Sequence, residues 1–375
     1  MKIKLYNKIA SCGLERLPAD FEVAETAADY DGILVRSADL HEEAFPATLR
    51  AIARAGAGVN NIPLDKCTAA GITVFNTPGA NAQAVRELCL AALLLTSRKI
   101  ADGIEWSKTL AGNADALKIV EKEKSKFQGP EIFGKTLGVI GLGAVGGGLA
   151  GYAAELGMNV LGYDPYISVP AAWQMNPKVK KTDDLDEIFR NADYISVHVP
   201  SLPSTRGMLN RENFAKMKKG GRILNLARAD LAVDEDVLAA LADGTLSAYF
   251  TDFPTGALAG KPGVIATPHL GASTPEAEDN CAMMACDEIA DFLLNGNIRN
   301  SVNMPAVSAG RNGNARVGIF YRAGEETEVA LAPFFAKARV TKACRGEIAY
   351  ALADGESFDL DKIRAVSGVI RATAY

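Results

Sequence analysis

The chain has 375 residues, 48% of them hydrophobic and 23% charged, which suits two or three domains with their own cores and excludes wholesale disorder. Its net charge of −5 argues against a nucleic-acid or anionic-membrane partner, because there is no basic excess to neutralise phosphates. We expect a cytoplasmic protein with no targeting segment, membrane span or metal site, since no stretch is apolar enough to cross a bilayer and the six cysteines form no CxxC pair.

The first 95 residues alternate between strand and helix patterns, which is typical of a parallel sheet covered by helices. We predict strands over residues 3–6, 32–36 and 73–75, and a helix over residues 42–55. A mainly apolar helix over residues 81–99 follows and would bridge two domains. Residues 1–95 would therefore form the first part of a substrate-binding domain, to which residues 282–304 return.

A glycine-rich turn follows an apolar run at residues 136–140 that has the pattern of a buried strand. Gly141 would make a tight turn, Gly143 would let the backbone approach a pyrophosphate, and Gly146 would let the next helix pack closely on the strand. Ala144 and Val145 lie at that helix's N-terminus, where free N–H groups and the helix dipole favour phosphates. The pattern predicts a dinucleotide site.

A second apolar run, at residues 158–163, ends on Asp164. Its spacing from the glycines is close to that at which a carboxylate binds both hydroxyls of the adenosine ribose. This favours NAD over NADP, because a 2′-phosphate would meet a like charge.

The rest of residues 96–281 continues in the same alternation. We predict strands over residues 194–200, 222–226, 248–253 and 263–267, and helices over residues 211–217 and 234–243. This gives a six-stranded, doubly wound domain inserted into the first. Residues 103–134 have no clear period, and the charge run at residues 121–126 alternates in sign like a solvated helix face. A helix over residues 274–294 would lead back to the first domain.

Residues 305–375 differ in composition and form a separate module. The predicted order is strand 315–321, helix 325–337, strands 338–344 and 347–353, helix 359–366 and strand 369–374. A βαββαβ order within about 70 residues is typical of a small ferredoxin-like fold.

Several motifs together resemble the D-isomer-specific 2-hydroxyacid dehydrogenases. They are VRS at 35–37, RAGAGVNNI at 54–62, GITVFNTPGAN at 71–81, the glycine-rich turn, HVPSLPSTRGMLN at 198–210, ILNLARADLAVDEDVLAAL at 223–241 and TPHLGAST at 267–274. The resemblance implies an α/β fold with two flavodoxin- or Rossmann-like parallel-sheet domains, one of them the inserted NAD domain, and a substrate cleft between them.

The C-terminal module is similar to the ACT regulatory domain, with EIAYALADGE and VSGVIRATAY as its best matches. Serine-binding versions carry a histidine and an asparagine after the first strand. The corresponding turn here is YRAGEE at 321–326, which has neither residue, so this resemblance does not extend to a serine site. The module would then serve subunit association.

Oxidising a 2-hydroxy acid requires a base for the hydroxyl proton and a cation for the carboxylate. His269 is the candidate base and Arg228, just past a strand end, is the candidate anchor, since a guanidinium can bind a carboxylate in a bidentate way. By resemblance these two residues form the catalytic pair. The plain alternatives are a loop histidine with structural partners and a surface salt bridge.

The chain departs from the family pattern at two positions. Where relatives carry a glutamate that pairs with the histidine, the segment TDFPTGALAG places Gly256, and Ala229 replaces the usual glycine after the arginine. Asp252 is the nearest substitute for the glutamate, although it could instead contact the nicotinamide amide. We therefore expect oxidation to persist to lower pH than in typical relatives.

Cations of the first domain indicate the substrate. Arg36 and Arg54 lie near predicted strand ends and favour a phosphorylated acid, and the resemblance makes D-3-phosphoglycerate the one that we expect; the alternative for Arg54 is an arginine at a helix C-terminus. By resemblance, further substrate contacts are Ser37, Ala57, Gly58 and Asn81, and further cofactor contacts are His198, Pro200, Thr205, Ala227, Asp252, His269 and Gly271. The resemblance also implies a homodimer or homotetramer. The rival functions are a dehydrogenase for another D-2-hydroxy acid and an NAD-binding sensor with impaired turnover.

Overall fold

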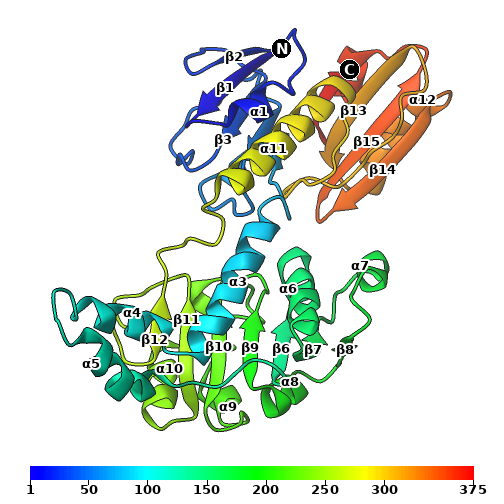
Figure 1. Ribbon diagram of the computed structural model, residues 1–375. Coiled ribbons are helices and arrows are strands. Elements are labelled where there is room, and N and C mark those ends of the chain that lie inside the picture. The colour runs from blue at the N-terminus through cyan, green and yellow to red at the C-terminus, as the bar shows by residue number, and fades with distance from the viewer. The chain divides into compact units, whose positions relative to one another are not determined.

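A computed structural model describes residues 1–375 and divides the chain into two compact units. Unit 1 comprises Met1–Asn81 and Thr274–Tyr375, and unit 2 comprises Ala82–Ser273 (Figure 1). The second unit is thus an insertion in the first. The chain leaves unit 1 after residue 81 and returns at residue 274, whereas the sequence patterns place these borders near residues 95 and 281. No helix is both long and apolar enough to cross a bilayer.

Unit 1 contains a five-stranded parallel sheet in the order β2-β1-β3-β4-β5. Its strands are β1 Lys2–Tyr6, β2 Glu22–Ala24, β3 Gly32–Val35, β4 Ala51–Arg54 and β5 Thr73–Phe75. The predicted strands at 3–6, 32–36 and 73–75 are confirmed. Strand β2 is too short and too exposed for its pattern to be recognised.

The predicted helix over residues 42–55 is wrong. Residues 51–54 form β4, which pairs in parallel with β3 from Gly32 opposite Ala51 to Val35 opposite Arg54. The buried run Ala51–Ala53 suits a central strand, and Pro46 lies where the helix interior would be. A proline there removes a backbone donor and clashes with the preceding turn.

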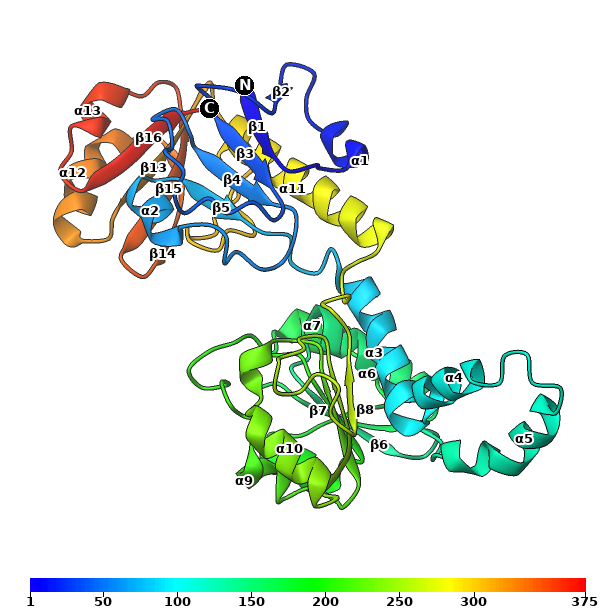
Figure 2. The same cartoon turned by 90° about the vertical axis from the view of Figure 1, so that its left-hand side faces the viewer.

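Three helices belong to this part of unit 1: α1 Ser11–Leu14, α2 Leu64–Ala69 and α11 Pro275–Asn295. Helix α11 is capped at its start by the Thr274 hydroxyl, which accepts from the N–H of Ala277, and it ends at Gly296 with a φ of 72°. Its apolar face packs on β3, β4 and β5 (Figure 2). Helix α1 lies so close to it that a side chain on Gly13 would come within 2.6 Å of the backbone of Ala282.

The C-terminal module has the predicted βαββαβ order. Its elements are β13 Ala315–Arg322, α12 Glu325–Phe335, β14 Arg339–Arg345, β15 Ile348–Gly355, α13 Leu360–Arg364 and β16 Val369–Ala374. The antiparallel sheet has the order β14-β15-β13-β16, which is the ferredoxin-like arrangement. One face joins the core of unit 1, where the rings of Phe320 and Tyr350 stack at 4.3 Å between centroids and Phe320 also contacts Phe292 of α11.

Unit 2 is organised around a seven-stranded parallel sheet in the order β12-β11-β10-β9-β6-β7-β8. The strands are β6 Thr136–Ile140, β7 Asn159–Tyr163, β8 Val179–Lys181, β9 Tyr194–Val197, β10 Gly221–Asn225, β11 Leu246–Thr251 and β12 Val264–Ala266. The six predicted strands are present. A seventh, β8, was missed because its three residues, Val-Lys-Lys, carry no apolar run.

Helices cover both faces of this sheet, as expected for a doubly wound domain (Figure 1). The helices of unit 2 are α3 Ala82–Ser97, α4 Ile100–Lys108, α5 Ala116–Glu123, η1 Lys124–Phe127, α6 Ala144–Glu155, α7 Val169–Trp173, α8 Leu185–Asn191, α9 Arg211–Phe214, η2 Ala229–Leu231 and α10 Asp234–Ala242. The long helix α3 is confirmed. The charge run at residues 121–126 lies on α5 and η1, where exposed lysines pair with glutamates three positions earlier.

Candidate active site

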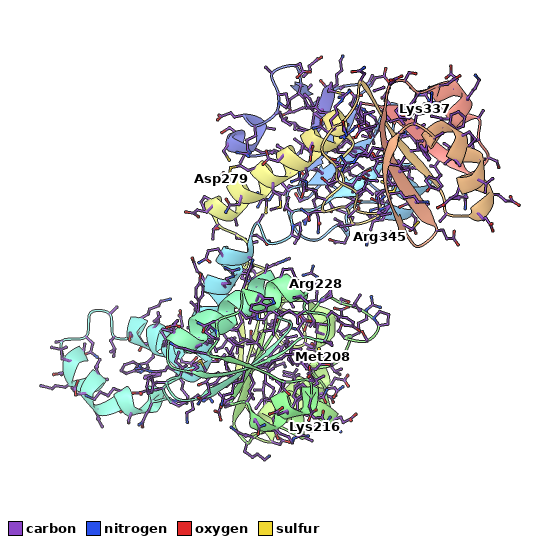
Figure 3. The ribbon with its side chains drawn as sticks, turned by 90° about the vertical axis from the view of Figure 1, so that its right-hand side faces the viewer. Met208, Lys216, Arg228, Asp279, Lys337 and Arg345 are labelled. Carbon is purple, nitrogen blue, oxygen red and sulfur yellow. The ribbon has the colours of Figure 1, made fainter.

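The candidate residues of unit 2 lie in loops at one edge of its sheet. All seven strands are parallel, so their carboxyl ends meet at that edge. The glycine-rich turn follows β6, Asp164 follows β7, Arg228 follows β10, Asp252 follows β11 and His269 follows β12. Figure 3 shows Arg228 at one end of unit 2 and Lys216, which precedes β10, at the other. Doubly wound sheets bind their ligands at this edge, beside the point where strand order reverses, here between β6 and β9.

The glycine-rich turn has the geometry of a phosphate cradle. Gly141 has a φ of 92°, and a side chain on Gly146 would come within 1.9 Å of the carbonyl oxygen of Gly141. Gly143 precedes α6 without any side-chain cap, and a side chain there would meet nothing within 4 Å. The N–H groups of the first helical turn, which includes Ala144 and Val145, therefore face open space. The turn fits the pyrophosphate of a dinucleotide.

Asp164 holds this turn in place through its carboxylate. Its Oδ2 accepts from the N–H of Leu142 at 2.9 Å, and its Oδ1 accepts from the N–H of Tyr166 at 2.9 Å. The side chain is half-buried, and each carboxylate oxygen keeps a lone pair for a further donor.

Arg86 on α3 was not identified from the sequence. Its Nε donates to the carbonyl oxygen of Ala144 at 2.9 Å and places a positive charge beside the first turn of α6. Only the packing of α3 on α6 brings it there, so no local motif could have revealed it.

His198 lies behind the glycine-rich turn. Its Nε2 is 2.8 Å from the hydroxyl of Ser196, and its backbone carbonyl lies where a side chain on Gly141 would be. Burial lowers the pKa of this imidazole to about 4, so it is neutral at physiological pH. In the loop that follows, the hydroxyl of Thr205 donates to the carbonyl oxygen of Pro200 at 2.6 Å.

Arg228 is exposed, and a buried asparagine holds its backbone. Asn225, at the end of β10, accepts from the N–H groups of Ala227 and Arg228 through Oδ1 and donates to the carbonyl oxygen of Arg228 through Nδ2 at 2.8 Å. The guanidinium has one internal bond, from Nη1 to the carbonyl oxygen of Ala227 at 2.6 Å. Most of its donors therefore face solvent and can bind a carboxylate. Asn225 is a positioning residue that the sequence patterns did not reveal.

His269 is exposed and has a φ of 55°, one of only two positive values at non-glycine residues in the chain. Strained backbone of this kind gathers at functional sites, which here agrees with the predicted base. Its imidazole packs on the ring of Phe253, with 4.8 Å between the ring centroids. Its backbone N–H donates to the carbonyl oxygen of Asp252 at 3.0 Å.

The carboxylate of Asp252 is buried and accepts hydrogen bonds from the loop that carries His269. Oδ1 accepts from the hydroxyl of Thr267 at 2.6 Å and from the N–H of Leu270 at 2.7 Å, and Oδ2 accepts from the N–H of Gly271 at 2.7 Å. All its hydrogen bonds thus go to the loop, and neither Asp252 nor any other carboxylate pairs with the imidazole of His269. A side chain added at Gly256 would have no other atom within 4 Å of its Cβ.

The candidate residues of unit 1 gather at the carboxyl edge of its own sheet. Arg36 follows β3 and Arg54 ends β4, and the Nε of Arg54 donates to the carbonyl oxygen of Arg36 at 2.9 Å. Gly56 lies under this side chain, because any side chain there would come within 2.6 Å of Nη1 of Arg54. Arg36 also forms an exposed ion pair with Glu278 of α11 at 2.6 Å.

The remaining candidates line the same edge. Ser37 is held by Asn7, whose Oδ1 accepts from its N–H at 2.9 Å, and Ala57 accepts from Nδ2 of Asn76 at 2.6 Å. Gly58 follows directly, and Asn81 is half-buried just before α3. No group of three or more His, Cys, Asp and Glu side chains could hold a metal ion.

Comparison with known proteins agrees with this geometry. Residues 90–271 match the family described as "D-isomer specific 2-hydroxyacid dehydrogenase, NAD binding domain". The chain is 35% identical over 315 residues to D-3-phosphoglycerate dehydrogenase of Synechocystis sp., covering 82% of this chain and 54% of that protein. It is 37% identical over 297 residues to the protein of the same name from Methanocaldococcus jannaschii, covering 76% and 54%. The chain thus spans about half the length of the curated relatives that it matches.

A solved structure is similar as well. It is the NAD⁺-bound 3-phosphoglycerate dehydrogenase of Entamoeba histolytica, with a TM-score of 0.61 and 28% sequence identity, and the match covers 81% of this chain and 98% of that one.

Proposed function

Because the chain belongs to the D-isomer-specific 2-hydroxyacid dehydrogenases, we propose that it oxidises D-3-phosphoglycerate to 3-phosphohydroxypyruvate with NAD, the reaction that opens serine biosynthesis. The observation that carries this proposal is the order of loops along the sheet of unit 2. The ends of β6, β10, β11 and β12 present the glycine-rich turn, Arg228 and the Asp252-anchored loop of His269 at one edge.

The spacing of these strands is compatible with a shared reaction centre. Strands β10 and β12 are separated only by β11, so their ends lie about 10 Å apart. Arg228 and His269 extend beyond those ends on exposed loops. A small hydroxy acid can therefore contact a guanidinium and an imidazole at once.

The residues divide the chemistry between them. Arg228 binds the substrate carboxylate and polarises the adjacent carbon. A ring nitrogen of His269 takes the hydroxyl proton while the C–O bond becomes a carbonyl and the carbon gives up a hydride. NAD supplies the hydride acceptor, and its pyrophosphate and ribose would be held by the turn at Gly143 and by Asp164. In the reverse direction His269 returns the proton to the new hydroxyl.

The cations of unit 1 support a phosphorylated substrate. Arg54 is fixed over its own turn, which reduces the entropy that a flexible side chain would lose on binding a phosphate. The rival is a dehydrogenase for an unphosphorylated 2-hydroxy acid. The ion pair between Arg36 and Glu278 favours that rival, because it neutralises one of the two cations.

A substrate panel with an Arg54→Ala variant separates these two functions. We expect kcat/KM for D-3-phosphoglycerate to fall about 100-fold or more on loss of this charge-assisted contact, with little change for D-lactate or D-glycerate. A wild-type preference for an unphosphorylated acid, unaffected by the substitution, would support the rival.

We further infer a cytoplasmic enzyme that assembles as a homodimer or homotetramer. All six cysteines are free and four of them are buried, which suits a reducing compartment. Sedimentation equilibrium of the full chain would determine the assembly.

A further inference from the structure

Unit 1 contains an open cavity of about 560 Å³ between the C-terminal module and the N-terminal sheet. One wall is formed by α13 and β16, and the other by Asp31 and the loop at residues 47–50. Neither the motifs discussed above nor the proposed reaction gives this cavity a role.

The cavity lies apart from the candidate substrate residues of the same sheet. Asp31 directly precedes β3 and Arg50 directly precedes β4, whereas Arg36 and Arg54 follow or end these strands. In a parallel sheet these are opposite edges, separated by the length of the strands. A ligand in the cavity would therefore occupy a second site.

The lining is rich in arginine. Arg50, Arg364 and Arg371 are its three cations and Asp31 is its single carboxylate. The carboxylate is already committed: Oδ2 accepts from the N–H of Lys2 at 2.8 Å, and Oδ1 lies 3.4 Å from Nη2 of Arg50. The lining residues thus carry an excess of two positive charges, part of which the exposed Asp361 offsets from outside the lining.

Two of these guanidinium groups are held in place by backbone carbonyl oxygens, and Arg371 has no carboxylate partner. Arg371 donates from Nη1 to the carbonyl oxygen of Leu49 and from Nη2 to that of Ala47, so it ties β16 to the neighbouring loop. Burial, together with the charge of Arg50, lowers the pKa of Arg371. Arg364 donates from Nε and Nη2 to the carbonyl oxygen of Ala372, and its Nη1 lies 3.4 Å from Oδ1 of the exposed Asp361. A guanidinium has five N–H donors, and each of these groups keeps some for a ligand.

We propose that this cavity binds a small polyanion, a phosphate or carboxylate compound whose oxygens are shared by Arg50, Arg364 and Arg371. Such a ligand would compensate the excess charge and form charge-assisted hydrogen bonds to both walls at once. Because it would join β16 to the loop before β4, it would also stabilise the docking of the C-terminal module. The proposal does not depend on the identity of the oxidised substrate.

The test is calorimetric titration of the full chain with inorganic phosphate and, separately, with succinate, at constant ionic strength. The variant is Arg364→Gln, whose side chain is half exposed and whose loss should leave the fold intact. Its matched control is Arg339→Gln, an exposed arginine on β14 at the other edge of the module's sheet.

We expect Arg364→Gln to weaken binding of at least one of the two anions about tenfold and Arg339→Gln to leave it within about twofold. The anion whose affinity falls in Arg364→Gln shows whether the site binds phosphate oxygens or carboxylate oxygens. Equal affinities in the two variants for both anions would overturn the proposal. A crystal grown with selenate gives an independent readout: an anomalous peak among the three arginines supports the site, and peaks only at the start of α6 or at Arg54 refute it.

Discussion

Asp252→Asn is the substitution that most sharply tests how the candidate base is positioned. The wild-type carboxylate accepts three hydrogen bonds at 2.6 to 2.7 Å from the loop that carries His269, and it is buried. The amide oxygen of asparagine can still serve the hydroxyl of Thr267 and the N–H of Leu270. Its NH₂ group would then face the N–H of Gly271, so one charge-assisted bond is lost and two donors oppose each other.

The energetic consequence is local. A hydrogen bond to a charged group contributes about 1.5–3 kcal/mol, so we expect the loop to be destabilised by about 2–4 kcal/mol. A displacement of about 1 Å at the reacting centre can cost roughly 100-fold in rate. We therefore expect kcat to fall about 30- to 100-fold, while the affinity for NADH changes less than about threefold.

Two assays read this out: steady-state kinetics, and hydrogen exchange of the peptide that spans residues 267–273. Asp183→Asn is the matched control, because Asp183 is exposed and pairs only with Lys181. Unchanged exchange and unchanged kcat would show that Asp252 does not hold the loop of His269 in place. So would a large shift in the pH profile with unchanged exchange, since that would mean that the carboxylate of Asp252 acts on the imidazole directly.

Three further predictions follow from other contacts. Glu278→Gln should lower KM for a phosphorylated acid about two- to fivefold by releasing Arg36 from an exposed ion pair, as measured by initial rates. Arg316→Ala should lower the free energy of unfolding by about 3–5 kcal/mol in denaturant titrations, because it leaves the buried carboxylate of Asp354 without its cation. In the wild type this carboxylate accepts hydrogen bonds from Nε and Nη2 of Arg316 at 2.7 and 2.8 Å. His198→Gln should reduce the fall in Tm between pH 7 and pH 5. In the folded protein the pKa of His198 is about 4, which is below its usual value. The unfolded chain therefore takes up a proton in this pH window before the folded protein does, and acidification favours unfolding.

Each of these predictions has an outcome that would contradict it. An unchanged KM after Glu278→Gln would mean that Arg36 does not meet the substrate. The control for Arg316→Ala is Arg345→Ala on the exposed edge strand β14. If both substitutions lowered the free energy of unfolding equally, the buried ion pair of Arg316 would not be the cause. A pH dependence of Tm that His198→Gln leaves unaltered would place the acid sensitivity elsewhere.

The sequence predicted most of the fold because its patterns were long and regular. The glycine-rich turn, the buried strands of unit 2 and the βαββαβ order of the module all combine periodicity with clear turn residues. The errors fell on short or interrupted segments. Pro46 interrupts the helix pattern of residues 42–55, and β8 has too few apolar residues to be recognised.

The candidate site was predictable where a motif supplied its own context, as for His269 and Arg228. The residues that hold those side chains were not. Asn225 and Arg86 act through tertiary hydrogen bonds to backbone carbonyls and amides, and nothing in their local sequence distinguishes them from ordinary polar residues. The role of Asp252 as an anchor of the loop likewise depends on the proximity of β11 to the segment after β12.

We propose that Arg228 and His269 serve one hydride transfer at the carboxyl edge of the unit 2 sheet. The most direct measurement is the rapid-mixing rate of NADH formation from NAD and D-3-phosphoglycerate, in the wild type and in Arg228→Gln and His269→Gln. We predict a measurable wild-type transfer that falls about 1000-fold in either variant, because an anchor and a proton acceptor are each required. Transfer at the wild-type rate in either variant, or no NADH from the wild type, would show that these two residues do not carry the reaction.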